Sequence, residues 1–149
     1  MNNKEISKKR FLAIDWGKKK IGFAISDPAN IYAMPIKPIE NKDDSFKVIL
    51  EIVKQYKINE VIIGLPLSEN KEETSICKII RQFSEKLMNL LNENGYFVSI
   101  SFQNEFYSTK NAESIQKNYI NKKKNWDIYK DSYSAMVILE DYLFSMSKK

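Results

Sequence analysis

Short apolar runs alternate with turn residues over the first third of the chain. Residues 11–15 and 21–26 form two such runs, and Gly17 with the three lysines after it predicts a hairpin turn between them. A third run, residues 31–39, contains two prolines, which confine it to the edge of a sheet or to irregular structure. This region therefore predicts a three-stranded antiparallel meander.

Beyond this meander the apolar positions change to helical spacing. Asp43, Asp44 and Ser45 are cap candidates for a first helix, and a second helix has an apolar stripe from Ile76 to Leu91. The pattern then predicts the following further elements: strands at 60–64 and 97–102, and a last helix from about Asp131 to Met146. Strands that alternate with helices after a meander indicate an α/β fold with a mixed five-stranded sheet flanked by helices.

The composition fits one soluble domain, expected over residues 11–146 and preceded by a flexible basic leader at residues 1–10. The 149 residues include 43% hydrophobic and 29% charged side chains. No apolar run approaches the roughly 20 residues of a membrane span. Asp15 interrupts the apolar stretch after the leader, which argues against a secretory signal. We therefore expect a cytoplasmic protein with no membrane partner.

Two absences limit the chemistry that the chain can perform. It contains no His and a single Cys. These absences exclude catalysis by a Ser–His–Asp or Cys–His group, intrachain disulfides and thiolate zinc sites. Carboxylates that bind a hard divalent cation need nothing that this sequence lacks. The net charge of +5 adds a weak indication of a polyanionic partner.

Three acids stand where predicted strands end or a predicted helix begins: Asp15, Glu105 and Asp131. Each also has an explanation without chemistry, because Asp15 can bond its own turn, Glu105 can be an exposed loop acid and Asp131 can cap a helix. If the three converge, their repulsion requires a cation, and Mg²⁺ or Mn²⁺ binds oxygen ligands alone. Two such ions can activate a water and stabilise the leaving oxygen of a phosphodiester.

Four segments together make the chain recognisable. They are residues 13–24 (Ala-Ile-Asp-Trp-Gly-Lys-Lys-Lys-Ile-Gly-Phe-Ala), residues 61–67 (Val-Ile-Ile-Gly-Leu-Pro-Leu), residues 104–109 (Asn-Glu-Phe-Tyr-Ser-Thr), and Asp131 with Ser134-Ala135. In order and spacing they resemble the YqgF family, which has a ribonuclease H-like fold and is related to RuvC-type Holliday junction resolvases. The resemblance covers Phe11 to about Phe144.

The resemblance implies a nuclease that matures the 16S ribosomal RNA precursor, with RNA favoured over DNA as substrate. Asp15, Glu105 and Asp131 match the acids to which the family's metal binding and catalysis are attributed. The following residues are implied or expected to bind substrate: Lys19, Lys20, Ser108 and Thr109 from the resemblance, and Lys122, Lys123 and Lys124 from a basic segment near Asp131. That basic segment is equally explained as a solvated loop.

Departures from the family pattern bear on how the substrate is held. Asn104 stands where the family has Asp, and Phe106 stands where it has Arg, so a planar phosphate clamp is lost. Lys18 replaces the usual Ser or Thr of the hairpin. Trp16 is expected to pack against a helix, and Cys77 to be a small core residue.

Three alternatives remain open from the sequence. A non-catalytic nucleic-acid-binding module could retain the fold without turnover. A resolvase of four-way DNA junctions would work as a homodimer, whereas the RNA nuclease could be a monomer or homodimer. An actin-like ATPase fragment shares the apolar strand, Asp and hairpin, but such ATPases need two domains and these 149 residues supply one.

Overall fold

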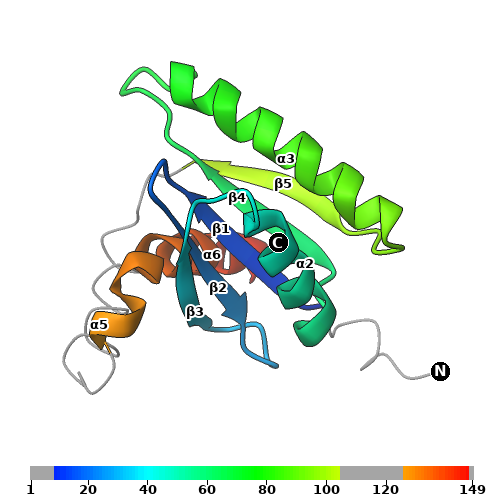
Figure 1. Ribbon diagram of the computed structural model, residues 1–149. Helices are drawn as coiled ribbons and strands as arrows, with labels where there is room; N and C mark the ends of the chain where they lie inside the picture. The colour runs from blue at the N-terminus through cyan, green and yellow to red at the C-terminus, as the bar shows by residue number, and fades with distance from the viewer. Residues whose placement is uncertain (1–8, 105–125, 148–149) are drawn as a thin grey trace.

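A computed structural model describes residues 9–104 and 126–147 of the chain. Within them, five strands form one mixed sheet in the order β3-β2-β1-β4-β5 (Figure 1). The strands are β1 (Phe11–Trp16), β2 (Lys20–Ser26), β3 (Ala33–Glu40), β4 (Glu60–Leu65) and β5 (Ser99–Asn104). β1 to β3 form an antiparallel meander, and β1, β4 and β5 are parallel. The predicted sheet is confirmed, and the strand with two prolines lies at its edge.

Helices cover both faces of the sheet. The helical elements are α2 (Ser45–Tyr56), α3 (Ser75–Glu93), α5 (Trp126–Tyr129), the 3₁₀ turn η2 (Lys130–Ser132) and α6 (Tyr133–Ser147). Asp131 was predicted to open the last helix, but it lies in the 3₁₀ turn before α6. In the described part of the chain, every helix is too short or too polar to cross a membrane.

Strand alternation divides the core into two layers. Successive side chains of a strand point to opposite faces, so Leu12 and Ile14 of β1 pack towards α2 and α3. Phe11 and Ala13 point the other way and pack against α6. Figure 1 shows α6 on the opposite face of the sheet from α2. Residues 135–141 of α6 are all buried, which agrees with a helix that lies along the sheet rather than at its margin.

Small residues let the chain approach the sheet closely where η2 meets β2. A Cβ atom built on Gly22 would lie 2.3 Å from the backbone oxygen of Asp131 and 3.0 Å from Cα of Ser132. No side chain fits at that distance, so only glycine permits this contact. Gly22 therefore fixes how near Asp131 comes to the sheet.

Ser132 fastens the same turn to two strands. Its buried hydroxyl accepts a hydrogen bond from the Phe23 N–H at 3.0 Å and donates one to the Ile36 carbonyl at 2.7 Å. Phe23 and Ile36 are paired next to a register shift between β2 and β3. The hydroxyl thus ties β2, β3 and η2 together where the strand pairing is irregular.

We predict that Ser132→Ala lowers the free energy of unfolding by about 2–4 kcal/mol, because two buried backbone groups lose a partner. Urea titration followed by circular dichroism measures the change. Ser145→Ala is the matched control, since the Ser145 hydroxyl bonds within its own helix, to the Asp141 carbonyl at 3.0 Å. A change of about 0.5 kcal/mol or less in both variants would contradict the role given to Ser132.

Candidate metal and nucleic-acid site

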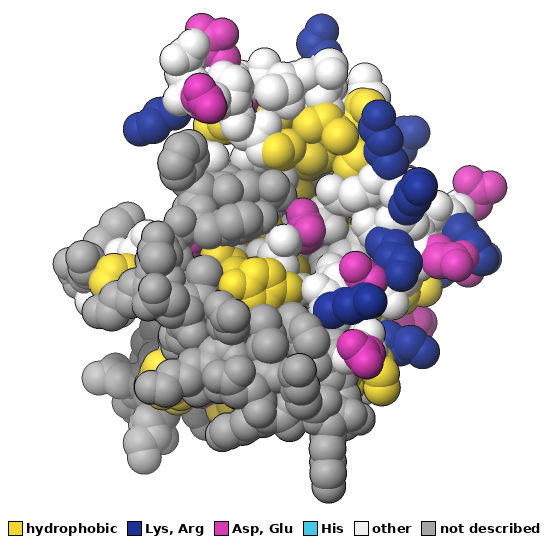
Figure 2. Space-filling model, turned by 90° about the vertical axis from the view of Figure 1, so that its left-hand side faces the viewer, with side chains coloured by type: hydrophobic (Ala, Val, Ile, Leu, Met, Phe, Trp, Pro, Cys, Tyr) yellow, Lys and Arg dark blue, Asp and Glu magenta, His cyan; other side chains and the backbone are white. Residues whose placement is uncertain are grey.

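The carboxyl ends of β1, β4 and β5 meet at one end of the sheet, because these strands are parallel. Figure 2 looks onto this end of the molecule. Lys and Arg side chains gather on one side of the view, with Asp and Glu side chains among them. Strand ends of this kind are where ligands bind in open α/β sheets.

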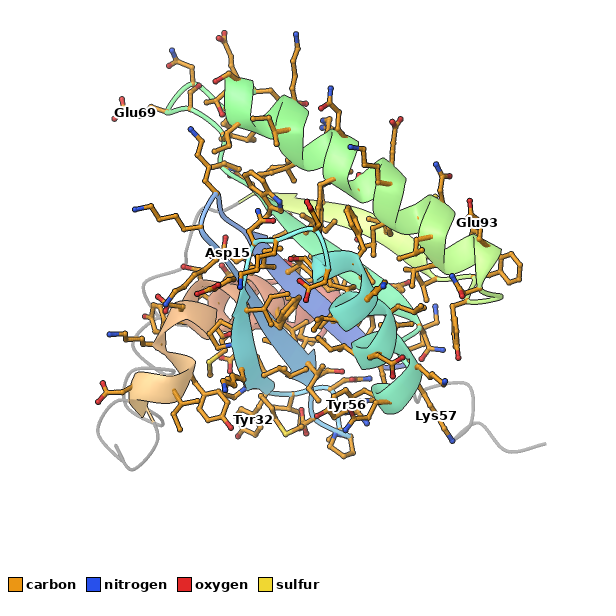
Figure 3. The ribbon with its side chains drawn as sticks, in the orientation of Figure 1. Asp15, Tyr32, Tyr56, Lys57, Glu69 and Glu93 are labelled. Atoms are coloured by element: carbon orange, nitrogen blue, oxygen red, sulfur yellow. The ribbon has the colours of Figure 1, made fainter. Side chains whose placement is uncertain are left out.

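Asp15 lies at this end, near the end of β1 (Figure 3). Phe11 and Ala13 pack against α6, so alternation places the half-buried Asp15 on the same face. Its cross-strand partner in β2 is Gly22. Because Gly22 has no side chain, the backbone of η2 can occupy the space above it, on the face that carries Asp15.

Asp131 reaches the same face of the sheet from η2. Its backbone oxygen lies over Gly22, the direct partner of Asp15 in the sheet. Directly opposed residues of two strands have Cβ atoms about 5 Å apart. The Asp15 side chain and the backbone of Asp131 therefore lie beside the same glycine on one face of the sheet. The role of both acids as metal ligands stays a prediction.

The other predicted residues lie outside the described ranges. These are Glu105, Ser108, Thr109, Lys122, Lys123 and Lys124. Within residues 9–104 and 126–147, no group of three or more His, Cys, Asp or Glu side chains could hold a metal ion. β5 is described up to Asn104. It lies two strands from β1 in the sheet, and its Gln103 pairs with Gly64 of the intervening strand β4. The described part of the site thus contains two of its three predicted acids.

Lys20 makes an ion pair with Asp131. Its Nζ lies 3.0 Å from Oδ2 of Asp131, and the two side chains are 55% and 39% exposed. Lys19, the other lysine predicted to bind phosphate, is exposed in the hairpin. The carboxylate of Asp131 therefore already attracts a positive charge.

Asn41 fixes the hairpin that carries these lysines, and sequence reasoning missed it. The Asn41 side chain donates to the Gly17 carbonyl at 2.7 Å, and its backbone N–H donates to the Lys19 carbonyl at 2.8 Å. A Cβ atom on Gly17 would lie 2.7 Å from the Lys20 carbonyl oxygen, so the tight turn requires glycine. An Asn directly after an edge strand carried no signal of this long-range contact.

A second pair of charges lies beside Lys20. Glu40 is the register partner of Lys20 in β3, and its carboxylate lies 2.8 Å from the Lys42 ammonium. The hydrogen bond from Lys42 lowers the pKa of Glu40, helped by the charges of Lys42 and, to a smaller degree, Lys20. Cations and anions thus alternate along this end of the sheet.

Comparison with known proteins decides the family. A family model described as "RuvX: Holliday junction resolvase" matches residues 9–145. The chain belongs to the RuvX family. RuvX and YqgF are two names of one family, so the match confirms the resemblance found in the sequence and, with it, the nuclease class.

Curated relatives match nearly the full chain. The protein named "Putative pre-16S rRNA nuclease" in Sulfurihydrogenibium sp. is 36% identical to this chain over 138 residues, which cover 93% of this chain and 92% of the relative. The protein of that name in Malacoplasma penetrans is 37% identical over 136 residues, covering 91% and 94%. The one in Dictyoglomus turgidum is 32% identical over 140 residues, covering 93% and 96%.

Solved structures confirm the fold. Thermus thermophilus RuvC in complex with a Holliday junction has a TM-score of 0.55 at 9% identity, covering 93% of this chain and 96% of that one. The fowlpox virus resolvase with its junction DNA has a TM-score of 0.56 at 15% identity, covering 92% and 98%. The RuvX-family chain therefore has the ribonuclease H-like architecture expected from its sequence.

Two residues near the site have the structural roles expected of them. Trp16 lies on the α3 side of the sheet, with its ring centroid 6.4 Å from that of Phe83. Cys77 is fully buried near the start of α3. Neither side chain belongs to the face that carries Asp15.

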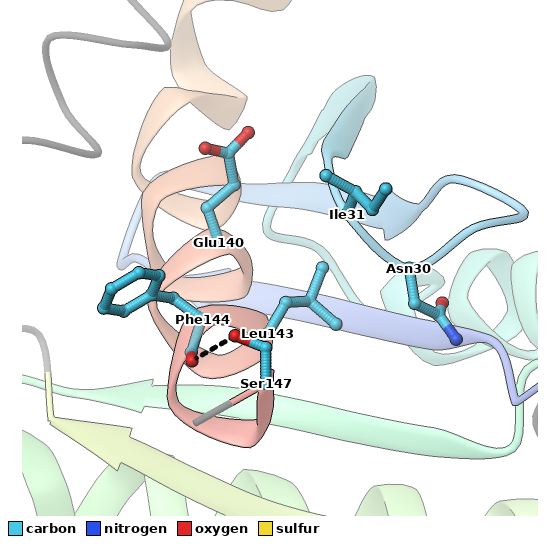
Figure 4. A pocket seen from close by; sticks show the side chains of 6 residues that line it. All are labelled: Asn30, Ile31, Glu140, Leu143, Phe144 and Ser147. Carbon is cyan, nitrogen blue, oxygen red and sulfur yellow. Dashed lines mark hydrogen bonds between the residues drawn. The ribbon is translucent and has the colours of Figure 1, made fainter. Parts of the chain in front are cut away.

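A buried acid of this RuvX-family chain lies away from the site, in a pocket at the β2–β3 connection. Figure 4 shows Glu140 of α6 with the other lining residues: Asn30, Ile31, Leu143, Phe144 and Ser147. Burial raises the pKa of Glu140, and the negative charges of Asp141 and Asp27 raise it further. A hydrogen bond from the Ala33 N–H, at 3.3 Å, opposes the shift.

We predict that Glu140→Gln stabilises the protein at pH 7 relative to wild type. The folded-state pKa lies above the usual value of a glutamate, so over this range of pH the folded state retains a proton that the unfolded state releases. Wild-type stability therefore falls as pH rises from about 4.5 through the folded-state pKa. The glutamine is neutral throughout and avoids this loss.

Urea midpoints between pH 4 and pH 8 test this expectation. The difference between Glu140→Gln and wild type should grow with pH and then level off. Glu51→Gln, at an exposed glutamate of α2, serves as the control for a change of charge alone. A difference that is the same at both pH extremes would show that Glu140 is ionised normally.

Proposed function

We propose that this chain is a divalent-metal-dependent nuclease that processes the precursor of 16S ribosomal RNA. The observation that carries the proposal is that Asp15 pairs with Gly22 at the end of the sheet and that the backbone of Asp131 lies over the same glycine. The names of the curated relatives, which cover over nine tenths of the chain, support the substrate.

The residues present fit Mg²⁺ or Mn²⁺. Two carboxylates offer oxygen ligands of the kind that these hard cations prefer. The ammonium of Lys20 already pairs with Asp131. This ion pair supports the assignment of Asp131 to a site that attracts positive charge. We assign Glu105 as the third ligand, because β5 runs parallel to β1 and β4 towards the same end of the sheet. Bound metal supplies Lewis acidity for phosphodiester hydrolysis.

The polyanion is bound by the basic residues around the acids. We assign this role to Lys19 and Lys20 in the hairpin and to the following residues outside the described ranges: Ser108, Thr109, Lys122, Lys123 and Lys124. Phosphate contacts position the substrate without reading its sequence. Release of counterions then makes binding weaken steeply with salt.

A four-way DNA junction is the second candidate substrate. The description of the matching family and the fold shared with two junction resolvases favour it. Resolution of a symmetric junction needs two active sites, and a homodimer would supply them. Because the curated relatives are named for RNA and are far more similar in sequence, we rank RNA first.

We predict that purified protein cleaves precursor 16S RNA only with Mg²⁺ or Mn²⁺, and that Asp15→Asn and Asp131→Asn each lower kcat/KM on the order of 100-fold or more. Asparagine keeps the shape but loses the charge that holds the cation. Gel analysis of labelled RNA and of a four-way DNA junction measures the rates side by side.

Asp43→Asn is the matched control, since Asp43 is exposed between β3 and α2. It should keep activity within about twofold of wild type. Thermal melting of each variant separates loss of catalysis from loss of the fold. RNA binding without cleavage at any divalent metal concentration would refute the enzyme in favour of a binding module, and cleavage of the junction alone would refute RNA as substrate.

A further inference from the structure

We propose that Lys20 is a built-in counterion of the metal site. Its ammonium pairs with Asp131 until a divalent cation displaces the ammonium. The inference rests on the proposed function in one respect, namely that Asp131 is a metal ligand. It assigns to this lysine a control over metal affinity, in addition to the contact with phosphate expected from the sequence.

The position of Lys20 in β2 places its charge at the site. Lys20 lies two residues before Gly22, so alternation puts both on the face that Asp15 shares. Asp131 comes over Gly22 from η2, and its Oδ2 lies 3.0 Å from the Lys20 ammonium. A cation bound between the two acids would therefore lie next to this ammonium and be repelled by it.

The backbone around Lys20 is held in place, so its side chain extends from a fixed position near Asp131. Asn41 clamps the hairpin through the carbonyls of Gly17 and Lys19. The edge strand β3 pairs Lys20 with Glu40 on the other side. The side chain of Lys20 has room to move, because it is 55% exposed.

Glu40 gives the displaced ammonium a second anionic neighbour. The charge of Lys20 already contributes to the lowered pKa of Glu40, although Lys42 contributes more. Exposed ion pairs are weak, so a divalent ion that gains several oxygen ligands can replace the lysine at Asp131. The ammonium then adds to the positive charge that the polyanion meets.

Metal affinity of the free protein tests the proposal. Titration with Mn²⁺, followed by calorimetry or by loss of the free-ion electron paramagnetic resonance signal, should show Lys20→Met binding about threefold to tenfold more tightly than wild type. Lys20→Arg keeps the charge and should bind within about twofold of wild type. The difference should shrink in about 1 M salt, which screens exposed charges.

Lys42→Met is the matched control, because Lys42 is another exposed lysine of this end but pairs with Glu40 rather than with Asp131. It should change Mn²⁺ affinity by less than about twofold. Tighter binding in Lys20→Met alone supports the proposal. Equal or weaker binding in Lys20→Met than in wild type overturns it.

Asp131→Asn separates this failure from failure of the proposed function. If Asp131→Asn loses Mn²⁺ binding while Lys20→Met matches wild type, the metal site stands and the counterion role of Lys20 falls. If Asp131→Asn binds Mn²⁺ as well as wild type does, Asp131 is no ligand and the proposed metal site itself is refuted.

Discussion

The close contact of η2 with β2 at Gly22 is the constraint on which the rest of the site depends. The backbone oxygen of Asp131 occupies the space where any other residue at position 22 would place its Cβ. Ser132 secures the contact by bonding to both Phe23 and Ile36. Since Asp15 is the direct partner of Gly22, this one approach places the backbone of Asp131 beside the strand position that faces Asp15.

Electrostatics bears on how the predicted acids could lie near one another. Carboxylates brought together repel each other unless a cation lies near. Here Lys20 pairs with Asp131, and Lys42 pairs with Glu40 in the neighbouring strand. Both pairs are exposed enough to exchange partners, which suits the proposed binding of a divalent ion and a polyanion.

The strands, the edge position of β3 and the candidate acid Asp15 could be predicted from residue patterns, because each of these features depends on local chemistry. Alternating apolar runs specified the strands, the prolines Pro35 and Pro38 placed β3 at an edge, and Asp15 was marked by its position at the end of a buried strand. Glu105 and Asp131 were marked in the same way by predicted element ends, and the family resemblance then implied metal-binding and catalytic roles for all three acids. The fold and the family are confirmed, while the metal-binding and catalytic roles remain predictions.

Contacts between residues far apart in the chain could not be predicted from the sequence pattern. Ser132 reads as an ordinary serine before a helix, yet its partners lie 109 and 96 residues away. Lys20 reads as a phosphate ligand, and its pairing with Asp131 spans 111 residues. Asn41 likewise bonds to the hairpin only because β3 returns beside it. Such partners follow from the register of the sheet rather than from local propensity.

A crystal structure with bound Mn²⁺, located by its anomalous scattering, tests the central claim most directly. The account predicts an ion within about 2–2.5 Å of carboxylate oxygens from both Asp15 and Asp131. An ion bound elsewhere on a well-ordered protein, or these two side chains directed to separate surfaces, would contradict it.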